Sequence, residues 1–295
     1  MNRRRALQAL AALPAAGLVA CSPLAVVNGL SPDGGYRLDA GIAYGPGERQ
    51  RLDLYTPETG RPAEALVVFF YGGAWRSGRR EDYRFVGQAL TGLGLAVAIA
   101  DYRLYPEVVF PVFVEDSAAA VAWALTHTAE AGVASRRVFV MGHSAGAYNA
   151  AMVALAPGYL AAQGARPSEL AGFIGLAGPY DFLPLKGRLL TQVFGGAPDL
   201  AATQPVSFVS AAAPPALLAT GDADTTVLPR NTQRLAARYR GAGAPVEERV
   251  YEGVDHYRLI GALAEPLRRF APVLDDTAAF VRNGASALAG RAGHA

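Results

Sequence analysis

Ser144 is the residue whose surroundings point most directly to chemistry. It lies in the middle of the pattern Gly-His-Ser-Ala-Gly at 142–146, which follows the apolar run at 138–141 and precedes a helix-forming stretch of small residues. A serine placed between strand and helix in this way is typical of a nucleophile elbow, a sharp turn that lifts the hydroxyl clear of the sheet. The glycines matter because the strained turn leaves no room for Cβ atoms. The pattern predicts a nucleophilic serine, provided that the chain also supplies a base, an acid and an oxyanion hole.

A base must take the proton of the serine hydroxyl, and the sequence offers four histidines. His127 falls inside an amphipathic segment that suits surface or packing roles, and His294 lies in the terminal tail. His143 is part of the turn itself, where we expect it to point away from the nucleophile. His256 follows the last expected strand through a short loop that contains glycine, so it reaches the same edge of the sheet as Ser144. We therefore predict His256 as the base, with a structural histidine as the alternative.

The acid that orients this histidine should lie between the serine and the histidine in chain order. The segment Gly-Asp-Ala-Asp at 221–224 follows an expected strand, so both of its carboxylates emerge at the required edge. We prefer Asp224, because the second acid lies on the outgoing loop, whereas Asp222 suits bonding to backbone N–H groups of the turn. Asp181 and Asp255 are lesser alternatives.

An oxyanion hole needs backbone N–H groups aimed at the charge that develops in the transition state. One is expected from Ala145, the residue after the nucleophile, at the start of its helix. The other should come from the loop after the third strand, where the sequence reads Tyr-Gly-Gly-Ala-Trp at 71–75. Adjacent glycines let the backbone turn its amides inward and approach a substrate closely.

The elements that must position these residues alternate between strand and helix patterns, which predicts a doubly wound α/β fold with a mostly parallel, eight-stranded sheet and ligands at the carboxyl ends of the strands. The middle strands are continuous apolar runs, as expected for parallel strands buried on both faces. We expect strands at 37–44, 51–55, 66–70, 96–100, 137–141, 172–177, 216–219 and 246–251, and helices at 84–91, 112–130, 145–155, 229–240 and 275–283. Residues 178–214 break this rhythm with many Pro and Gly residues, and we expect them to form a small cap within a hydrolase-like domain at 37–283.

With these pieces assembled, the chain resembles the α/β-hydrolase superfamily, in particular its carboxylesterase and hormone-sensitive-lipase-like branch, over about residues 45–282. The family's His-Gly-Gly-x-Trp loop corresponds to 71–75 and its Asp-Tyr-Arg-Leu-x-Pro-Glu segment to 101–107, which looks structural, with Arg103 in buried polar contacts. The segment at 178–181 resembles one found in feruloyl-esterase-like and kynurenine-formamidase-like members.

The resemblance also assigns the oxyanion amides, which it places on Gly73 and Ala74 together with Ala145. Gly72 would then supply the turn of the loop. The first residue of the loop is Tyr71 where the family has histidine. The resemblance implies that this side chain mainly braces the loop, a role in which tyrosine can substitute.

Residues 1–20 have a basic start, an apolar stretch and a small residue before Cys21, which is the layout of a signal peptide. The ending Leu-Val-Ala-Cys resembles a bacterial lipobox, so we predict a lipidated Cys21, a tether over 21–36 and attachment to the periplasmic side of the outer membrane. A plain signal peptide with an incidental cysteine is the alternative, and Sec and twin-arginine export both remain open. The C-terminal residues 284–295 are expected to form a flexible tail.

The formal net charge of +2 falls to about −1 without the three arginines of the signal segment, and no long basic run remains, so nucleic acid is not an expected partner. No metal or organic cofactor is implied, since the sequence has neither a Cys/His cluster nor a phosphate-binding glycine loop. The sequence makes no prediction of oligomeric state.

The predicted function is a serine hydrolase that cleaves small or medium carboxylic esters through an acyl-enzyme intermediate. One alternative is an amide hydrolase of the arylformamidase type, because the elbow serves both bonds. Another is an inactive binding protein of the cell envelope. Trp75, Tyr148 and Tyr180 are candidates for contact with the substrate, although aromatic residues in such loops also serve simple packing.

Overall fold

A single eight-stranded sheet organises the computed structural model, which describes residues 27–29, 31–58 and 60–283. The strand order is β1-β2-β4-β3-β5-β6-β7-β8. β2 runs antiparallel to both β1 and β4, and every other neighbouring pair is parallel. The strands are β1 (Tyr36–Ala43), β2 (Arg51–Pro57), β3 (Leu66–Phe70), β4 (Ala96–Ala100), β5 (Val138–His143), β6 (Leu170–Leu176), β7 (Ala216–Gly221) and β8 (Val246–Tyr251).

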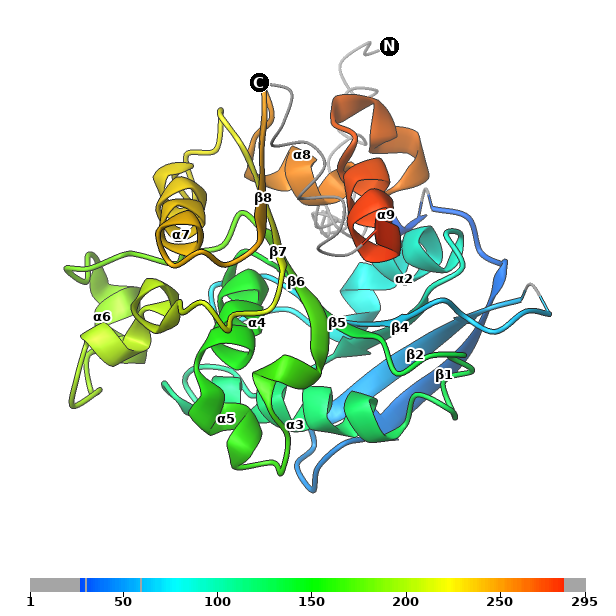
Figure 1. The fold of residues 1–295 in the computed structure, drawn as a ribbon, viewed down its shortest axis with the longest axis horizontal. Coiled ribbons are helices and arrows are strands. Elements are labelled where there is room, and N and C mark those ends of the chain that lie inside the picture. The colour runs from blue at the N-terminus through cyan, green and yellow to red at the C-terminus, as the bar shows by residue number, and fades with distance from the viewer. Residues whose placement is uncertain (1–26, 30, 59, 284–295) are drawn as a thin grey trace, which may run out of the picture.

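Helices cover both faces of this sheet (Figure 1). α2, α8 and α9 lie on one side, and α3, α4 and α7 lie on the other, with α6 beside α7 at the left of the view. The helices are α2 (Arg84–Thr91), α3 (Val112–Thr126), α4 (Ala145–Leu155), α5 (Pro157–Ala161), α6 (Arg188–Phe194), α7 (Arg230–Gly241), α8 (His256–Gly261) and α9 (Val273–Asn283). Short 3-10 helices occupy Arg80–Tyr83, Pro167–Glu169, Ala201–Thr203, Pro205–Phe208 and Glu265–Phe270.

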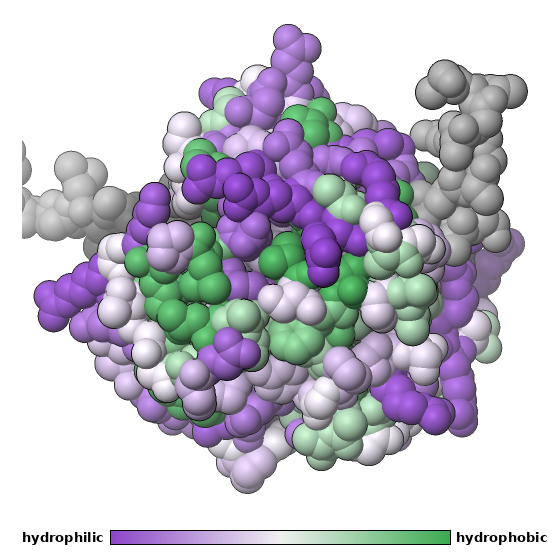
Figure 2. All heavy atoms as spheres, turned by 60° about the vertical axis from the view of Figure 1, so that its left-hand side comes forward, coloured by the Kyte–Doolittle hydropathy of each residue, from purple (hydrophilic) through white to green (hydrophobic). Residues whose placement is uncertain are grey.

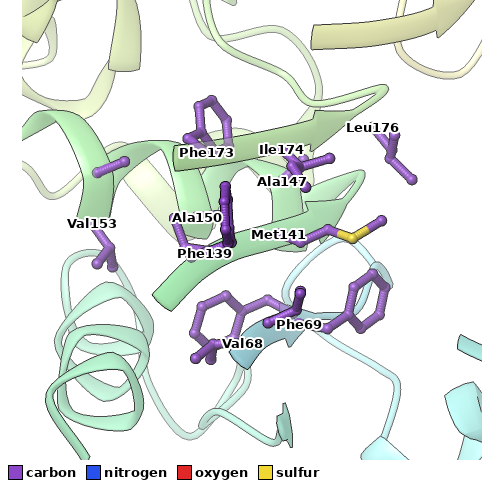
Figure 3. Packing of buried hydrophobic residues seen from close by; sticks show 14 of the residues in the cluster. Val68, Phe69, Phe139, Met141, Ala147, Ala150, Val153, Phe173, Ile174 and Leu176 are labelled. Carbon is purple, nitrogen blue, oxygen red and sulfur yellow. The ribbon is translucent and has the colours of Figure 1, made fainter. Parts of the chain in front are cut away.

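β3, β4 and β5 lie in the core, and all of their residues are buried. These strands read as unbroken apolar runs because helices cover both of their faces. α4 is also buried along its whole length, and its small residues Ala147 and Ala150 let the helix come close to β5 and β6 (Figure 3). The close packing holds the start of α4, and with it the elbow, at a fixed place above the sheet.

The predicted strands and long helices are all present, with ends that differ by at most three residues in all but one case. That exception is the helix expected over 112–130, which ends at Thr126, so His127 caps α3 rather than lying inside it. The chain turns there because the N–H of Ala131 donates to the carbonyl of His127 and Gly132 adopts a positive φ. Sequence reasoning also missed α5, α6 and α8, which are too short to show a hydrophobic period.

Residues 178–214 contain α6 and two 3-10 helices and no strand. Within the part of the chain that the structure describes, no helix combines the length and the apolar character that crossing a bilayer requires.

Candidate active site

Ser144 occupies a strained backbone position between the last residue of β5 and the first residue of α4. Its φ of 56° and ψ of −124° lie in a region that residues with a side chain rarely adopt. Both flanking glycines are needed: a Cβ on Gly142 would lie 2.3 Å from the carbonyl oxygen of Gly146, and one on Gly146 would lie 2.1 Å from that of Phe70. The turn leaves the serine half-buried, at the carboxyl end of a central strand. The local geometry is therefore that of the predicted elbow.

Asp224 and His256 are bonded side chain to side chain. Nδ1 of His256 lies 2.7 Å from Oδ2 of Asp224, and the two residues are only 4% and 2% exposed. The other carboxylate oxygen of Asp224, Oδ1, accepts hydrogen bonds from the N–H groups of Thr226 and Val227 at 2.9 and 2.8 Å. The carboxylate is thus fixed by the loop after β7 and accepts a hydrogen bond from Nδ1–H of His256, which leaves Nε2 free to act as a base.

The other acidic candidates have separate structural roles. Asp222 is exposed and accepts the N–H of Gly253 at 2.7 Å, which ties the loop after β7 to the loop after β8. Asp255 caps α8, since its side chain accepts the N–H groups of the second and third residues of that helix. Asp181 forms an ion pair with Arg234 at 2.9 Å. Of the four carboxylates, Asp224 is the one in contact with His256.

His143 lies closer to the predicted base than expected. Its ring centre is 4.6 Å from that of His256, and its Nε2 lies 3.2 Å from the backbone carbonyl oxygen of His256. A carbonyl only accepts, so Nε2 carries the proton and Nδ1 does not. Burial lowers the pKa of His143 well below its usual value, and the nearby His256 lowers it further. The expectation that His143 merely points away from the site was too simple, because this neutral ring supports the start of α8.

The glycine loop, residues 71–75, lies directly against the elbow. A Cβ on Gly72 would be 3.0 Å from Cβ of Ser144, so a larger residue would crowd the nucleophile. Gly73, Ala74 and Trp75 all have positive φ values, of 131°, 53° and 57°. Ala74 and Ala145 border the same cavity as Ser144, whereas Gly73 is not among the residues of that wall.

Tyr71 anchors the glycine loop to a buried polar network. Its hydroxyl donates to Oδ1 of Asp101 at 2.7 Å and accepts from Nη2 of Arg49 at 2.8 Å. Its ring stacks on that of Tyr102 at 4.8 Å, and the hydroxyl of Tyr102 donates to the carbonyl of Tyr71. Burial raises the pKa of the Tyr71 hydroxyl, so it stays protonated and able to donate. The tyrosine thus braces the loop at the position where the similar family has histidine.

Arg103 has the structural role expected of it. Its guanidinium forms two bonds with the carboxylate of Asp116, at 2.9 and 2.7 Å, and its N–H adds a third at 2.9 Å. Asp116 is buried at the first turns of α3, so the pair ties the segment after β4 to that helix.

A cavity of about 540 Å³ opens beside Ser144. Its wall comes from four segments, within 74–75, 144–145, 179–190 and 225–234. On the face that carries α6 and α7, apolar surface lies directly beside strongly hydrophilic side chains (Figure 2). Sequence reasoning offered only aromatic residues of the third segment, Tyr180 and Phe182, for contact with the substrate, and Phe182 does lie in the wall. It did not find the fourth segment, because no local pattern shows that the two segments meet across the sheet edge.

The three aromatic candidates for substrate contact fall in different places. Trp75 lies in the cavity wall, where its Nε1 donates to Asn149 at 3.0 Å. Tyr148 and Tyr180 are fully buried and do not form part of that wall. Tyr148 donates its hydroxyl hydrogen to the carbonyl of Thr203. Tyr180 packs against Gly175 in β6 and Gly178 just after that strand, so both tyrosines support the elements around the site. For these two residues the structure favours the packing alternative.

No group of three or more side chains suited to hold a metal ion occurs among the described residues. Cys21 and the predicted signal, tether start and tail lie outside the described residues.

Sheet order, elbow and glycine loop together are those of the α/β-hydrolase fold. Esterase 2 of Thermogutta terrifontis, in a structure described as phosphoramylated by tabun, aligns with a TM-score of 0.70 and 25% sequence identity over 85% of this chain and 96% of its own. The model of the BD-FAE family matches residues 52–239, and the chain belongs to that family.

Curated relatives support the same assignment. A probable isoprenylcysteine α-carbonyl methylesterase of Arabidopsis thaliana is 28% identical over 249 residues, which are 77% of this chain and 52% of the plant protein. The chain thus spans about half the length of that relative. A kynurenine formamidase of Danio rerio is 24% identical over 233 residues, 76% of each chain.

Proposed function

We propose that the protein is a serine hydrolase that cleaves carboxylic esters of small or medium size through an acyl-enzyme intermediate. The observation that carries this proposal is the buried 2.7 Å bond between His256 and Asp224, at the sheet edge that also holds the strained Ser144. Names of relatives add to it, since the plant protein is a probable methylesterase and the Thermogutta protein an esterase.

The proposed reaction has two halves that use the same residues. Ser144 Oγ attacks the ester carbonyl carbon while Nε2 of His256 takes the hydroxyl proton, and the tetrahedral intermediate collapses as His256 returns that proton to the leaving alcohol. Water then attacks the acyl-serine, with His256 again as base, and releases the carboxylic acid and free Ser144. Asp224 holds the ring and stabilises its protonated form throughout.

The charge on the carbonyl oxygen would be stabilised by backbone amides of the glycine loop and the elbow. Ala74 and Ala145 border the cavity with Ser144 and supply the simplest pair, and Gly73 is the third candidate. The positive φ values in the loop reorient successive amides, a conformation suited to binding an anion.

A formamide is the second candidate substrate, because a kynurenine formamidase matches three quarters of the chain and the same intermediate serves both bonds. An inert binding protein of the cell envelope is the remaining alternative. The buried acid–histidine pair argues against it, since a protein without chemistry gains little from keeping a carboxylate and an imidazole buried together.

The direct test compares the wild-type protein with Ser144→Ala on 4-nitrophenyl acetate, 4-nitrophenyl butyrate and an aryl formamide. We expect turnover of the esters by the wild type and a fall of at least about 10³-fold in the variant, with an unchanged circular dichroism spectrum. Faster cleavage of the formamide would favour the second candidate. Ester turnover that survives in the folded variant would overturn the role of Ser144.

A further inference from the structure

The cavity beside Ser144 carries an excess of positive charge. Lys186, Arg230 and Arg234 contribute to its wall, and Asp181 is the one acidic side chain among the residues of that wall. Lys186 is also the only lysine in the sequence, in a chain that otherwise uses arginine as its cation.

Only one of these cations is neutralised. Arg234 forms its ion pair with Asp181 at 2.9 Å. Within the described residues, neither the Lys186 ammonium nor the Arg230 guanidinium has a hydrogen-bond or ion-pair partner, and both residues are exposed at the cavity mouth. Most arginines around the glycine loop and its network, by contrast, are paired with carboxylates. Two unpaired cations therefore face one cavity from two separate segments.

Helix α7 adds to the same field. It begins at Arg230, so its N-terminal end, which carries a partial positive charge, lies at the wall of the cavity. Besides these cations and Ser144, the wall contains apolar side chains, among them Phe182, Leu190 and Leu228. A molecule that fills the cavity would therefore contact Ser144, apolar surface and positive charge.

We infer that the substrate is an ester that also carries a carboxylate or another anionic group, separated from the scissile carbonyl by an apolar segment, and that Lys186 and Arg230 bind this anion. The inference rests on the proposed esterase function and names the substrate class of the same site. Positive potential in a cleft raises the local concentration of an anionic substrate, and the two cations then offset the loss of its hydration.

The kinetic test uses matched esters that differ only in charge. On the acyl side, 4-nitrophenyl hydrogen suberate is compared with its methyl ester, and a series from adipate to sebacate varies the spacing. On the alcohol side, 4-octanoyloxybenzoate is compared with its methyl ester. In at least one arm we expect kcat/KM for the anionic ester to exceed that of its neutral partner by about fivefold, since each exposed ion pair contributes modestly. Salt at 0.5 M should reduce this preference.

The double variant Lys186→Gln/Arg230→Gln should bring the ratio of anionic to neutral kcat/KM close to one, and Lys186→Glu/Arg230→Glu should bring it below one. Arg136→Gln is the matched control. Arg136 is an exposed arginine just before β5, at the opposite edge of the sheet, and its variant should keep the wild-type ratio. A wild-type ratio near one in both arms, or a preference that persists in the charge-reversed variant, would overturn the inference.

Failure of the inference and failure of the proposed function are distinguishable. Hydrolysis without charge preference contradicts only the inference, whereas no hydrolysis of any ester contradicts the proposed function.

A binding experiment then tests the anion site alone. Reductive methylation with ¹³C-formaldehyde keeps the positive charge of Lys186. Because Lys186 is the only lysine in the sequence, its labelled methyl groups give the one lysine signal in the NMR spectrum. Suberate should shift this signal in a saturable way while 1,8-octanediol does not, and equal responses to both would contradict an anion site.

Discussion

At the scale of single residues, the two oxygens of Asp224 have different tasks. Oδ1 is held by two backbone N–H groups of its own loop, and Oδ2 bonds to Nδ1 of His256. The loop therefore holds the carboxylate in place, and the carboxylate in turn orients the His256 ring. A neutral amide at position 224 would favour the wrong tautomer of His256.

Replacing Asp224 by Asn should lower kcat for 4-nitrophenyl butyrate by about 10³- to 10⁴-fold. Asp222→Asn is the control, because within the described residues that carboxylate accepts only the N–H of Gly253. This substitution should lower kcat by less than about threefold. Steady-state kinetics on both variants measures the difference. Equal losses would contradict the assignment of Asp224.

His143 leads to a prediction about pH and stability. Burial keeps its pKa in the folded protein well below the value of about 6.5 that it has when unfolded. Below about pH 6.5 the unfolded chain binds a proton that the folded chain does not. The free energy of unfolding therefore decreases as the pH is lowered, by up to about 1.4 kcal/mol per pH unit from this group. His143→Gln should make the dependence shallower in urea unfolding between pH 7.5 and 5. An unchanged slope would show that His143 is not held neutral.

At the scale of elements, the glycine loop depends on the network below it. Tyr71 connects the loop to Asp101 and Arg49, and the loop's positive φ values are tolerated only because surrounding contacts hold them. Tyr71→Phe leaves both partners with one bond fewer in a buried place. We expect a loss of about 1–3 kcal/mol in the free energy of unfolding, together with a several-fold lower kcat.

Tyr239→Phe serves as the control for Tyr71→Phe. The hydroxyl of Tyr239 is also buried but has no hydrogen-bond partner within the described chain, so its removal should leave stability and kcat unchanged or slightly improve stability. Urea unfolding and ester kinetics on both variants test the contrast. If the two variants behave alike, Tyr71 does not brace the loop.

The strands and helices also show how much of the fold the sequence predicts. β3 and β4 have the predicted bounds, because buried parallel strands are marked by unbroken apolar runs. β8 also has the predicted bounds although none of its residues is buried, because glycine and proline residues precede it and a glycine follows it closely. His256 was expected on a loop but is the first residue of α8, and Asp255 as helix cap was the available signal. The contact between His143 and His256 joins residues 113 positions apart, so no local pattern contains it.

At the scale of the whole molecule, the parallel strands bring distant segments to one edge. β3, β5 and β7 end directly before the glycine loop, Ser144 and the loop of Asp224, respectively. Because the crossovers return each parallel strand in the same direction, these carboxyl ends meet at one place. The cavity wall, by contrast, depends on how 179–190 packs against 225–234, which strand patterns do not determine.

The predicted lipid anchor belongs to this scale too, and it remains a proposal. If Cys21 is lipidated, Cys21→Ser should move the protein from the membrane to the soluble periplasmic fraction when expressed in a bacterium with an outer membrane. Ser22→Ala is the control and should leave the location unchanged. Fractionation followed by immunoblotting gives the result, and a variant that stays with the membrane would refute the anchor.

The most direct test of the central claim is the site of reaction with a fluorophosphonate probe, read by peptide mass mapping. We predict a single adduct on Ser144, its absence in Ser144→Ala, and much slower formation in His256→Ala, because the serine then lacks its base. An adduct on another residue, or no adduct on the folded wild-type protein, would contradict the account.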